Sequence, residues 1–252
     1  MKKLLLLLLL IFALPACNQT GNSTIRPKTT TNEASISNIH LGVEYMRRGE
    51  LEQALTKLER AREADPGYYG VYNVLGVLYQ RLGDPKQAER YFKKAIRLNA
   101  NDSATLNNYG QFLCQTDRPD EAEQTFLRAA DNPLYETPEI AITNAGLCAS
   151  LNGQPNTAER YFRQALSLNP TILIALIRMS QLSYEHAKYL SARAYLQRYL
   201  AITKHNAKTL WLGIRIEQNL GDDNAISSYS LLLRNNFPDS DEASMLQEAG
   251  IH

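Results

Sequence analysis

The chain has 252 residues, with 27 Lys and Arg against 26 Asp and Glu, so its formal net charge is +1. Charges of both signs are interspersed along the chain, whereas a nucleic-acid binder carries a basic face or stripe. Length, composition and charge therefore argue against a nucleic-acid partner.

Residues 1–16 have the pattern of a signal peptide. A short basic region, Met1-Lys2-Lys3, precedes an apolar run from Leu4 to Ala13. That run is too short to span a bilayer as a mature helix but suits a signal-peptide core. Leu14-Pro15-Ala16-Cys17 resembles a bacterial lipoprotein signal, in which the cysteine is acylated and exposed by cleavage. The alternative is a plain secretory signal with an incidental cysteine.

Residues 17–33 are predicted to be the lipidated Cys17 followed by a flexible tether. From Asn18 to about Glu33 the chain is rich in Thr, Asn and Ser, and Ile25 is almost its only apolar residue. Such a segment reaches at most about 50 Å. The resemblance to lipoproteins also implies a destination, because Asn18 is not aspartate, and by the sorting rules of enterobacteria this favours the outer membrane.

A unit of about 34 residues then repeats six times. Its register is set by two small residues twelve positions apart: Gly42 and Ala54, Gly76 and Ala88, Gly110 and Ala122, Gly146 and Ala158, Ser180 and Ala192, Gly213 and Ala225. This period is typical of the tetratricopeptide repeat (TPR), a helix–turn–helix unit that buries its apolar face only by stacking on its neighbours. We expect an all-α, right-handed superhelical TPR solenoid of six repeats plus a short C-terminal capping helix.

The second repeat illustrates the pattern. Gly76 and Tyr79 share one face of a first helix, Asp84-Pro85 begins the second helix, and Ala88 and Phe92 share one face of that helix. Gly76 and Ala88 are expected to be small because the two backbones approach there. The six repeats are predicted at 35–68, 69–102, 103–138, 139–172, 173–205 and 206–238, with the cap at 239–252.

Two repeats depart from the pattern. The third is longer by two residues, and its end, Asp131 to Pro138, contains two prolines, which predicts an extended connection. The fifth has Ser180 where glycine is usual, and its turn, His186-Ala187-Lys188, lacks glycine.

Cys114 and Cys148 lie on the first helices of neighbouring repeats. Packed helices are typically about 9–10 Å apart, whereas a disulfide needs Cα atoms within about 7 Å. We therefore expect two separate thiols, with a disulfide in an oxidising periplasm as the alternative.

No catalytic or metal-binding pattern is found. The histidines His40, His186, His205 and His252 have no paired spacing for a metal, and no phosphate-binding glycine loop or nucleophile motif occurs. The sequence predicts a protein that is not an enzyme, with no cofactor, no metal site and no small-molecule substrate.

The first helices of a TPR solenoid line its concave groove, which is the predicted partner-binding site. In the first repeat four of the five inward positions are apolar and the fifth is Arg47, and in the second and third repeats they are mostly polar. The candidate residues are Ile36, Ile39, Val43, Met46, Asn73, Val77, Asn107 and Gln111, with Gln80, Arg81 and Gln115 beside them. An exposed apolar row with neighbouring amides suits a peptide ligand. The alternative is that the tether or the next helix covers the row.

Several stretches resemble the family of type IV pilus biogenesis lipoproteins, PilF/PilW. They are Leu106 to Gly110, Asp131 to Tyr135, Leu210 to Arg215, and the region from Tyr229 to Pro238. The resemblance implies a pilotin, which is a lipid-anchored adaptor that binds the secretin subunit of the pilus machine. It also implies that the protein lies on the periplasmic face of the outer membrane, held by acyl chains on Cys17, and promotes localisation and multimerisation of the secretin there.

Two other functions remain open from the sequence. One is a general outer-membrane TPR lipoprotein that scaffolds peptidoglycan-processing or other envelope proteins. The other is a periplasmic chaperone with a loose client range. A TPR fold alone does not distinguish among these functions.

Overall fold

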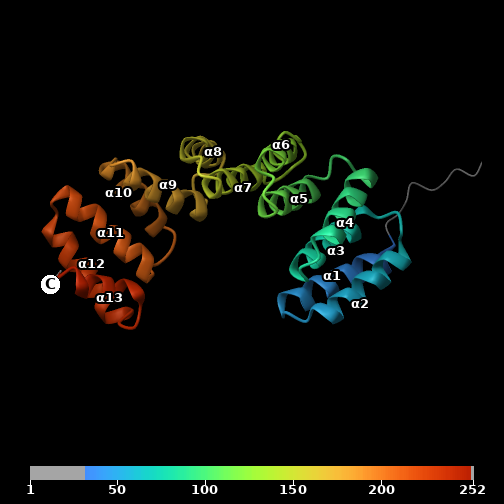
Figure 1. The fold of residues 1–252 in the computed structure, drawn as a ribbon, viewed down its shortest axis with the longest axis horizontal. Coiled ribbons are helices and arrows are strands. Elements are labelled where there is room, and N and C mark those ends of the chain that lie inside the picture. Colours follow the sequence, from blue (N-terminus) through green and yellow to red (C-terminus); the bar gives the residue numbers. More distant parts are fainter. Residues whose placement is uncertain (1–31, 251–252) are drawn as a thin grey trace, which may run out of the picture. The chain divides into compact units, whose positions relative to one another are not determined.

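The computed structural model describes residues 32–250. The predicted signal peptide, the predicted lipid attachment at Cys17 and nearly all of the predicted tether lie outside this range. Within it the chain forms 13 α-helices and no strand (Figure 1): α1 Glu33–Arg47, α2 Leu51–Ala64, α3 Tyr69–Arg81, α4 Pro85–Leu98, α5 Ser103–Gln115, α6 Pro119–Ala130, α7 Pro138–Leu151, α8 Pro155–Leu168, α9 Leu173–Glu185, α10 Tyr189–Leu200, α11 Ala207–Leu220, α12 Asp223–Asn236 and α13 Asp241–Glu248. None of these helices is both long and apolar enough to cross a membrane.

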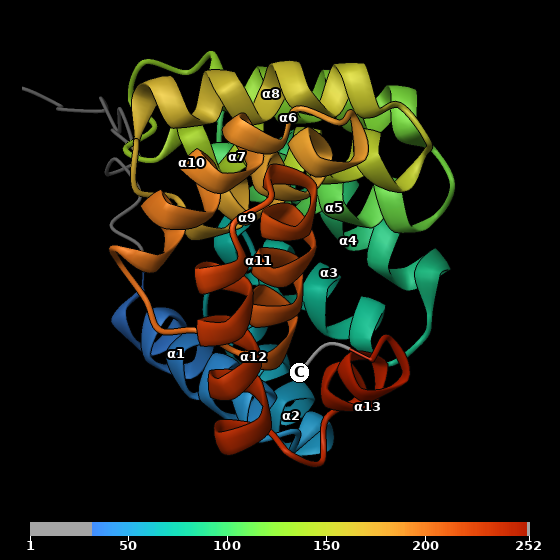
Figure 2. The ribbon, with the colours of Figure 1, turned by 90° about the vertical axis from the view of Figure 1, so that its left-hand side faces the viewer.

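The helices form six pairs, from α1–α2 to α11–α12, and each pair packs on the next in chain order (Figures 1 and 2). The last helix, α13, packs on α11 and α12. Three of the second helices, α4, α6 and α8, begin with proline, where the missing N–H is of no consequence. The prediction of an all-α TPR solenoid is confirmed.

In five of the six repeats the first helix has a glycine at the position where a large side chain of the second helix packs against it. A Cβ atom on Gly76 would lie 2.7 Å from the ring of Phe92, and one on Gly110 would lie 2.7 Å from the ring of Phe126. Both rings are almost completely buried. We expected the glycine to allow two helix backbones to approach. The structure shows that it leaves room for a large side chain, which fills the core of its own repeat.

The fifth repeat replaces the glycine by a serine with a partner. The hydroxyl of Ser180 is buried and donates a hydrogen bond to the carbonyl of Ala192 at 2.9 Å. The hydrogen bond satisfies a polar group that would otherwise be costly to bury. Ser180 therefore joins α9 to α10 at the position where other repeats use glycine.

Charged side chains join neighbouring repeats. One residue after the small alanine of the second helix, four successive repeats carry Glu89, Glu123, Glu159 and Arg193. Glu89 accepts hydrogen bonds from Arg118 at 2.7 Å and from Tyr109 at 3.1 Å, both in the next repeat.

These contacts shift the pKa values of the groups involved. The Arg118 guanidinium, together with the Lys93 ammonium, lowers the pKa of Glu89 to about 2. Burial, followed by the negative charge of Glu89, raises the pKa of Tyr109 to about 12.

The sign of this contact reverses at the last repeat junction. Glu159 faces two basic groups of the fifth repeat, His186 and Lys188. Arg193, at the equivalent position one repeat later, instead pairs with Glu217, which is 4% exposed, and with Asp222. The junction between the fifth and sixth repeats therefore has the opposite polarity from the junction before it.

The third and fourth repeats are joined covalently. Cys114 of α5 and Cys148 of α7 form a disulfide, and their Cα atoms are 5.8 Å apart. The expectation of two separate thiols is wrong, because the typical spacing of packed helices is measured between their axes, and Cα atoms that face each other across two helices lie closer together than the axes do.

The side-chain amide of Asn132 fixes the segment that connects the third and fourth repeats. The side chain of Asn132 donates to the carbonyl of Asn101 at 2.9 Å and accepts from the backbone N–H of Leu134 at 3.0 Å. The longer linker is thus tied to the preceding repeat.

Candidate partner-binding groove

The predicted apolar row of the first repeat is only partly accessible. Ile39 and Met46 are 8% and 5% exposed, and both belong to a hydrophobic cluster that includes Leu58 of α2 and Tyr72 of α3. The expectation that they line an open surface is wrong, because α3 packs against α1 and covers them. Ile36 and Val43 remain half-buried on the inner side of α1.

Two predicted amides form a ladder between first helices. Asn73 is 9% exposed and accepts a hydrogen bond from Asn108 at 3.0 Å. Asn107 is 8% exposed and accepts one from Asn144 at 2.9 Å. These hydrogen bonds join α3 to α5 and α5 to α7. The oxygens of Asn73 and Asn107 are therefore engaged in holding the first helices in register.

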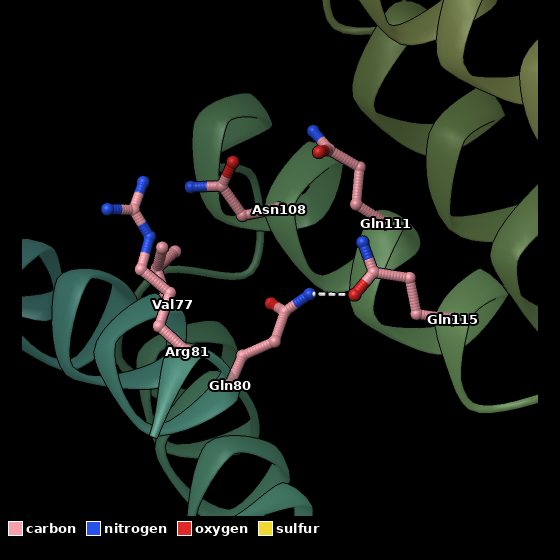
Figure 3. A pocket seen from close by; sticks show the side chains of 6 residues that line it. All are labelled: Val77, Gln80, Arg81, Asn108, Gln111 and Gln115. Carbon is pink, nitrogen blue, oxygen red and sulfur yellow. Dashed lines mark hydrogen bonds between the residues drawn. The ribbon is translucent and has the colours of Figure 1, made fainter. Parts of the chain in front are cut away.

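The remaining predicted residues meet in a pocket between α3 and α5 (Figure 3), which we call the amide pocket. Its volume is about 360 Å³. It is lined by Val77, Gln80, Arg81, Asn108, Gln111 and Gln115. Figure 3 shows the side chains of Gln80 and Gln115 directed toward each other, and Gln80 donates a hydrogen bond to Gln115 at 2.6 Å.

Amides dominate the chemistry of the amide pocket. Four of its six lining residues are Asn or Gln, each of which carries both donors and an acceptor. The one charged residue, Arg81, donates a hydrogen bond to the carbonyl of Met46 at 2.9 Å, at the C-terminal end of α1. A guanidinium is favourable at that end of a helix. The pocket suits the backbone of an uncharged peptide segment, with Val77 as its apolar floor.

Most residues that line the amide pocket were predicted from the sequence to face the groove. Val77 and Gln111 were expected at inward positions, and Gln80, Arg81 and Gln115 beside them. Asn108 was missed because it is not at one of the repeat positions expected to face inward, although it reaches α3 through its hydrogen bond to Asn73. The Asn107-Asn108 doublet was the available signal, since two adjacent amides on one helix can serve the ladder and the pocket together.

No group of three or more His, Cys, Asp or Glu side chains in residues 32–250 is placed to hold a metal ion.

Comparisons with known proteins agree with the fold. Tetratricopeptide repeat models match residues 33–101, 80–133 and 141–172. The type IV pilus assembly protein PilF of Pseudomonas aeruginosa is 32% identical over 236 residues, which are 93% of this chain and 94% of PilF.

Two solved structures are similar over most of the chain. A structure of P. aeruginosa PilF superposes with a TM-score of 0.77 at 32% identity, covering 88% of this chain and all of that one. A crystal structure of PilW, described as a widely conserved type IV pilus biogenesis factor, has a TM-score of 0.75 at 31% identity, with 86% and 99% covered.

Proposed function

The chain belongs to the PilF/PilW family of type IV pilus biogenesis TPR proteins, and from this membership we propose that it is a pilotin. It binds the secretin subunit of the pilus machine and promotes its localisation to the outer membrane and its assembly into a multimer. The observation that carries the proposal is the similarity to PilF along almost the whole chain.

The amide pocket supports peptide binding. A secretin segment in extended conformation offers backbone N–H and C=O groups, which Gln80, Gln111 and Gln115 can pair without demanding a charge. The half-buried Ile36 and Val43 of α1 add apolar surface for alternate side chains of the same segment. The groove of the first three repeats therefore offers backbone recognition next to apolar contact.

A lipid anchor at Cys17 supports the localisation. Several acyl chains hold a protein to a bilayer far more firmly than one chain does. A secretin subunit bound in the groove would then be held at a high local concentration beside the membrane in which it assembles. We place the protein on the periplasmic face of the outer membrane, as the residue after the cysteine, Asn18, favours.

The function is tested in a deletion strain. Outer membranes of wild-type and deletion cells are probed for the secretin multimer that resists heat and detergent. Loss of the multimer, with secretin left as monomers, is the expected result. Unchanged multimers together with defects in cell shape or the envelope would overturn the proposal and favour a scaffold for peptidoglycan-processing proteins.

The amide pocket is tested by Gln111→Arg, which fills the pocket with a longer, charged side chain. We expect secretin co-purification to fall about tenfold or more, since a charge buried without a partner is strongly unfavourable. Gln124→Arg on the exposed face of α6 is the matched control, and far-UV circular dichroism shows that both variants keep their helices. Equal secretin recovery from the two variants would exclude the amide pocket as the secretin site.

A further inference from the structure

The sixth repeat carries a group of side chains that the secretin groove does not use. Lys208, Trp211 and Arg215 occur at positions i, i+3 and i+7 of α11, so they share one face of that helix. Trp211 is the only tryptophan of the chain. It is half-buried, whereas Lys208 and Arg215 are exposed.

Helices α9 and α13 complete a pocket around this face. Its volume is about 290 Å³, and the other lining residues are Gln181, Tyr184 and Glu185 of α9, Leu212 of α11 and Glu242 of α13. The guanidinium carbon of Arg215 lies 4.4 Å from the ring centroid of Tyr184. Stacking of this kind holds a guanidinium in place while its N–H edges stay available to a carboxylate.

The two cations of the pocket have no acidic partner in the part of the chain that the structure describes. Arg118 and Arg193 of the repeat junctions pair with carboxylates, but neither Lys208 nor Arg215 forms a salt bridge with any residue from 32 to 250. A carboxylate from another molecule would therefore meet two free donors on either side of an aromatic ring.

The site continues along the solenoid. A second pocket of about 470 Å³ lies between α7 and α9 and shares Gln181 and Glu185 with the first. Ser150, Gly153, Pro155, Arg178 and Leu182 complete its lining. Two adjoining open pockets across successive repeats suit an extended chain better than a compact small molecule.

We propose that α9, α11 and α13 form a second recognition site, which takes an extended peptide segment of a partner protein that presents an apolar side chain next to a carboxylate. The apolar side chain packs on Trp211 and the carboxylate lies between Lys208 and Arg215. Glu185 and Glu242, which also line the pocket, repel a second acidic residue, so the site favours one carboxylate and not an acidic run. This site is separate from the amide pocket, so the protein can hold two segments at once.

The test uses the full chain in non-ionic detergent and an array of acetylated, amidated hexapeptides that combine each apolar residue with Asp, Glu, Asn or Gln. Peptides that bind are then titrated while Trp211 fluorescence is recorded. We expect Asp or Glu beside an apolar residue to be selected and the Trp211 emission to change on binding. Lys208→Gln with Arg215→Gln should weaken binding about tenfold or more.

Lys86→Gln with Arg97→Gln on the exposed side of α4 is the matched control and should bind like the wild type. Gln111→Arg should also leave this binding unchanged, so failure of the secretin proposal and failure of this one are distinguishable. An array that selects no carboxylate, or selects it equally with the Lys208 and Arg215 variant, would overturn the second site.

Discussion

The turn inside each repeat passes through one residue with a positive φ angle. Four repeats use glycine there, at φ values between 68° and 79°, whereas the third uses Asp117 at 60° and the fifth uses Ala187 at 55°. The left-handed region is unfavourable for a residue with a Cβ atom, and alanine lacks the local hydrogen bonding that lets aspartate adopt it. Ala187 is therefore a strained position in a turn that otherwise follows the repeat.

Ala187→Gly should stabilise the protein by about 0.5–1 kcal/mol, because glycine adopts the left-handed conformation without steric cost. The free energy of unfolding in urea measures the change. Ala201→Gly is the control, since Ala201 has a right-handed φ of −67° at the end of α10, and that change should be neutral or destabilising. A destabilised Ala187→Gly variant would show that the turn is not strained.

Individual residues show which features of the fold and of the candidate site could be predicted from the sequence and which could not. The spacing of Gly76 and Ala88 predicted the helix pairs, because a small residue leaves room for one large neighbour in every repeat. The burial of Ile39 was missed, since a repeat pattern gives the direction of a side chain and not what the next helix covers. The disulfide was missed because an interaxial spacing overstates the distance between Cα atoms that face each other, as those of Cys114 and Cys148 do.

At the scale of helices, the repeat junctions combine packing with charge. The Glu89–Arg118 contact spans α4 and the turn before α6, and the Cys114–Cys148 disulfide spans α5 and α7. Both act between neighbouring repeats. In a repeat protein the stability of such junctions determines whether the array unfolds as one unit.

Acid should weaken the junction between the second and third repeats. The pKa of Glu89 is about 2 in the folded chain and ordinarily 4.5, so its stabilising effect is complete above pH 4.5 and is lost as the pH falls toward 2. The shift corresponds to at most about 3 kcal/mol, and because solvent screens this partly exposed contact we expect a loss of about 1–2 kcal/mol. Glu89→Gln should be less stable at pH 7 and should show a flatter pH dependence between pH 4.5 and 2, as measured by urea unfolding. Identical pH profiles for the two proteins would contradict the assignment.

Reduction should weaken the junction between the third and fourth repeats. The disulfide closes a sequence separation of 34 residues, which corresponds to about 2–4 kcal/mol of stabilisation. A reducing agent should lower the urea midpoint of the wild type and leave the Cys114→Ser, Cys148→Ser variant unaffected. Equal midpoints for oxidised and reduced wild type would show that the bond adds no stability.

At the scale of the whole molecule, the proposed function needs a membrane anchor and a groove in one chain. Each is useful only with the other: an anchor without a groove carries nothing, and a groove without an anchor does not direct its ligand to a membrane. The proposed acylation site, Cys17, and the proposed partner-binding residues lie in different segments of the sequence, so they can be altered separately.

Cys17→Ala should separate the two parts. We expect the unacylated chain to leave the outer-membrane fraction while still co-purifying with secretin, because the groove is unchanged, and the multimers to appear in the inner membrane. Cell fractionation followed by immunoblotting measures both. A Cys17→Ala chain that remains in the outer membrane would show that acylation does not place it there.

The reversed polarity at the last junction restricts which repeats can be neighbours at this end of the array. If the fourth repeat were copied between the fifth and sixth, its own acidic side chain, equivalent to Glu159, would face the buried Glu217, and two carboxylates would meet without a cation. If the fifth were copied in tandem, Arg193 would face a second Lys188. Either rearrangement would thus yield a chain with a repulsive junction, so the sign of one contact limits which repeats can follow one another at this end of the solenoid.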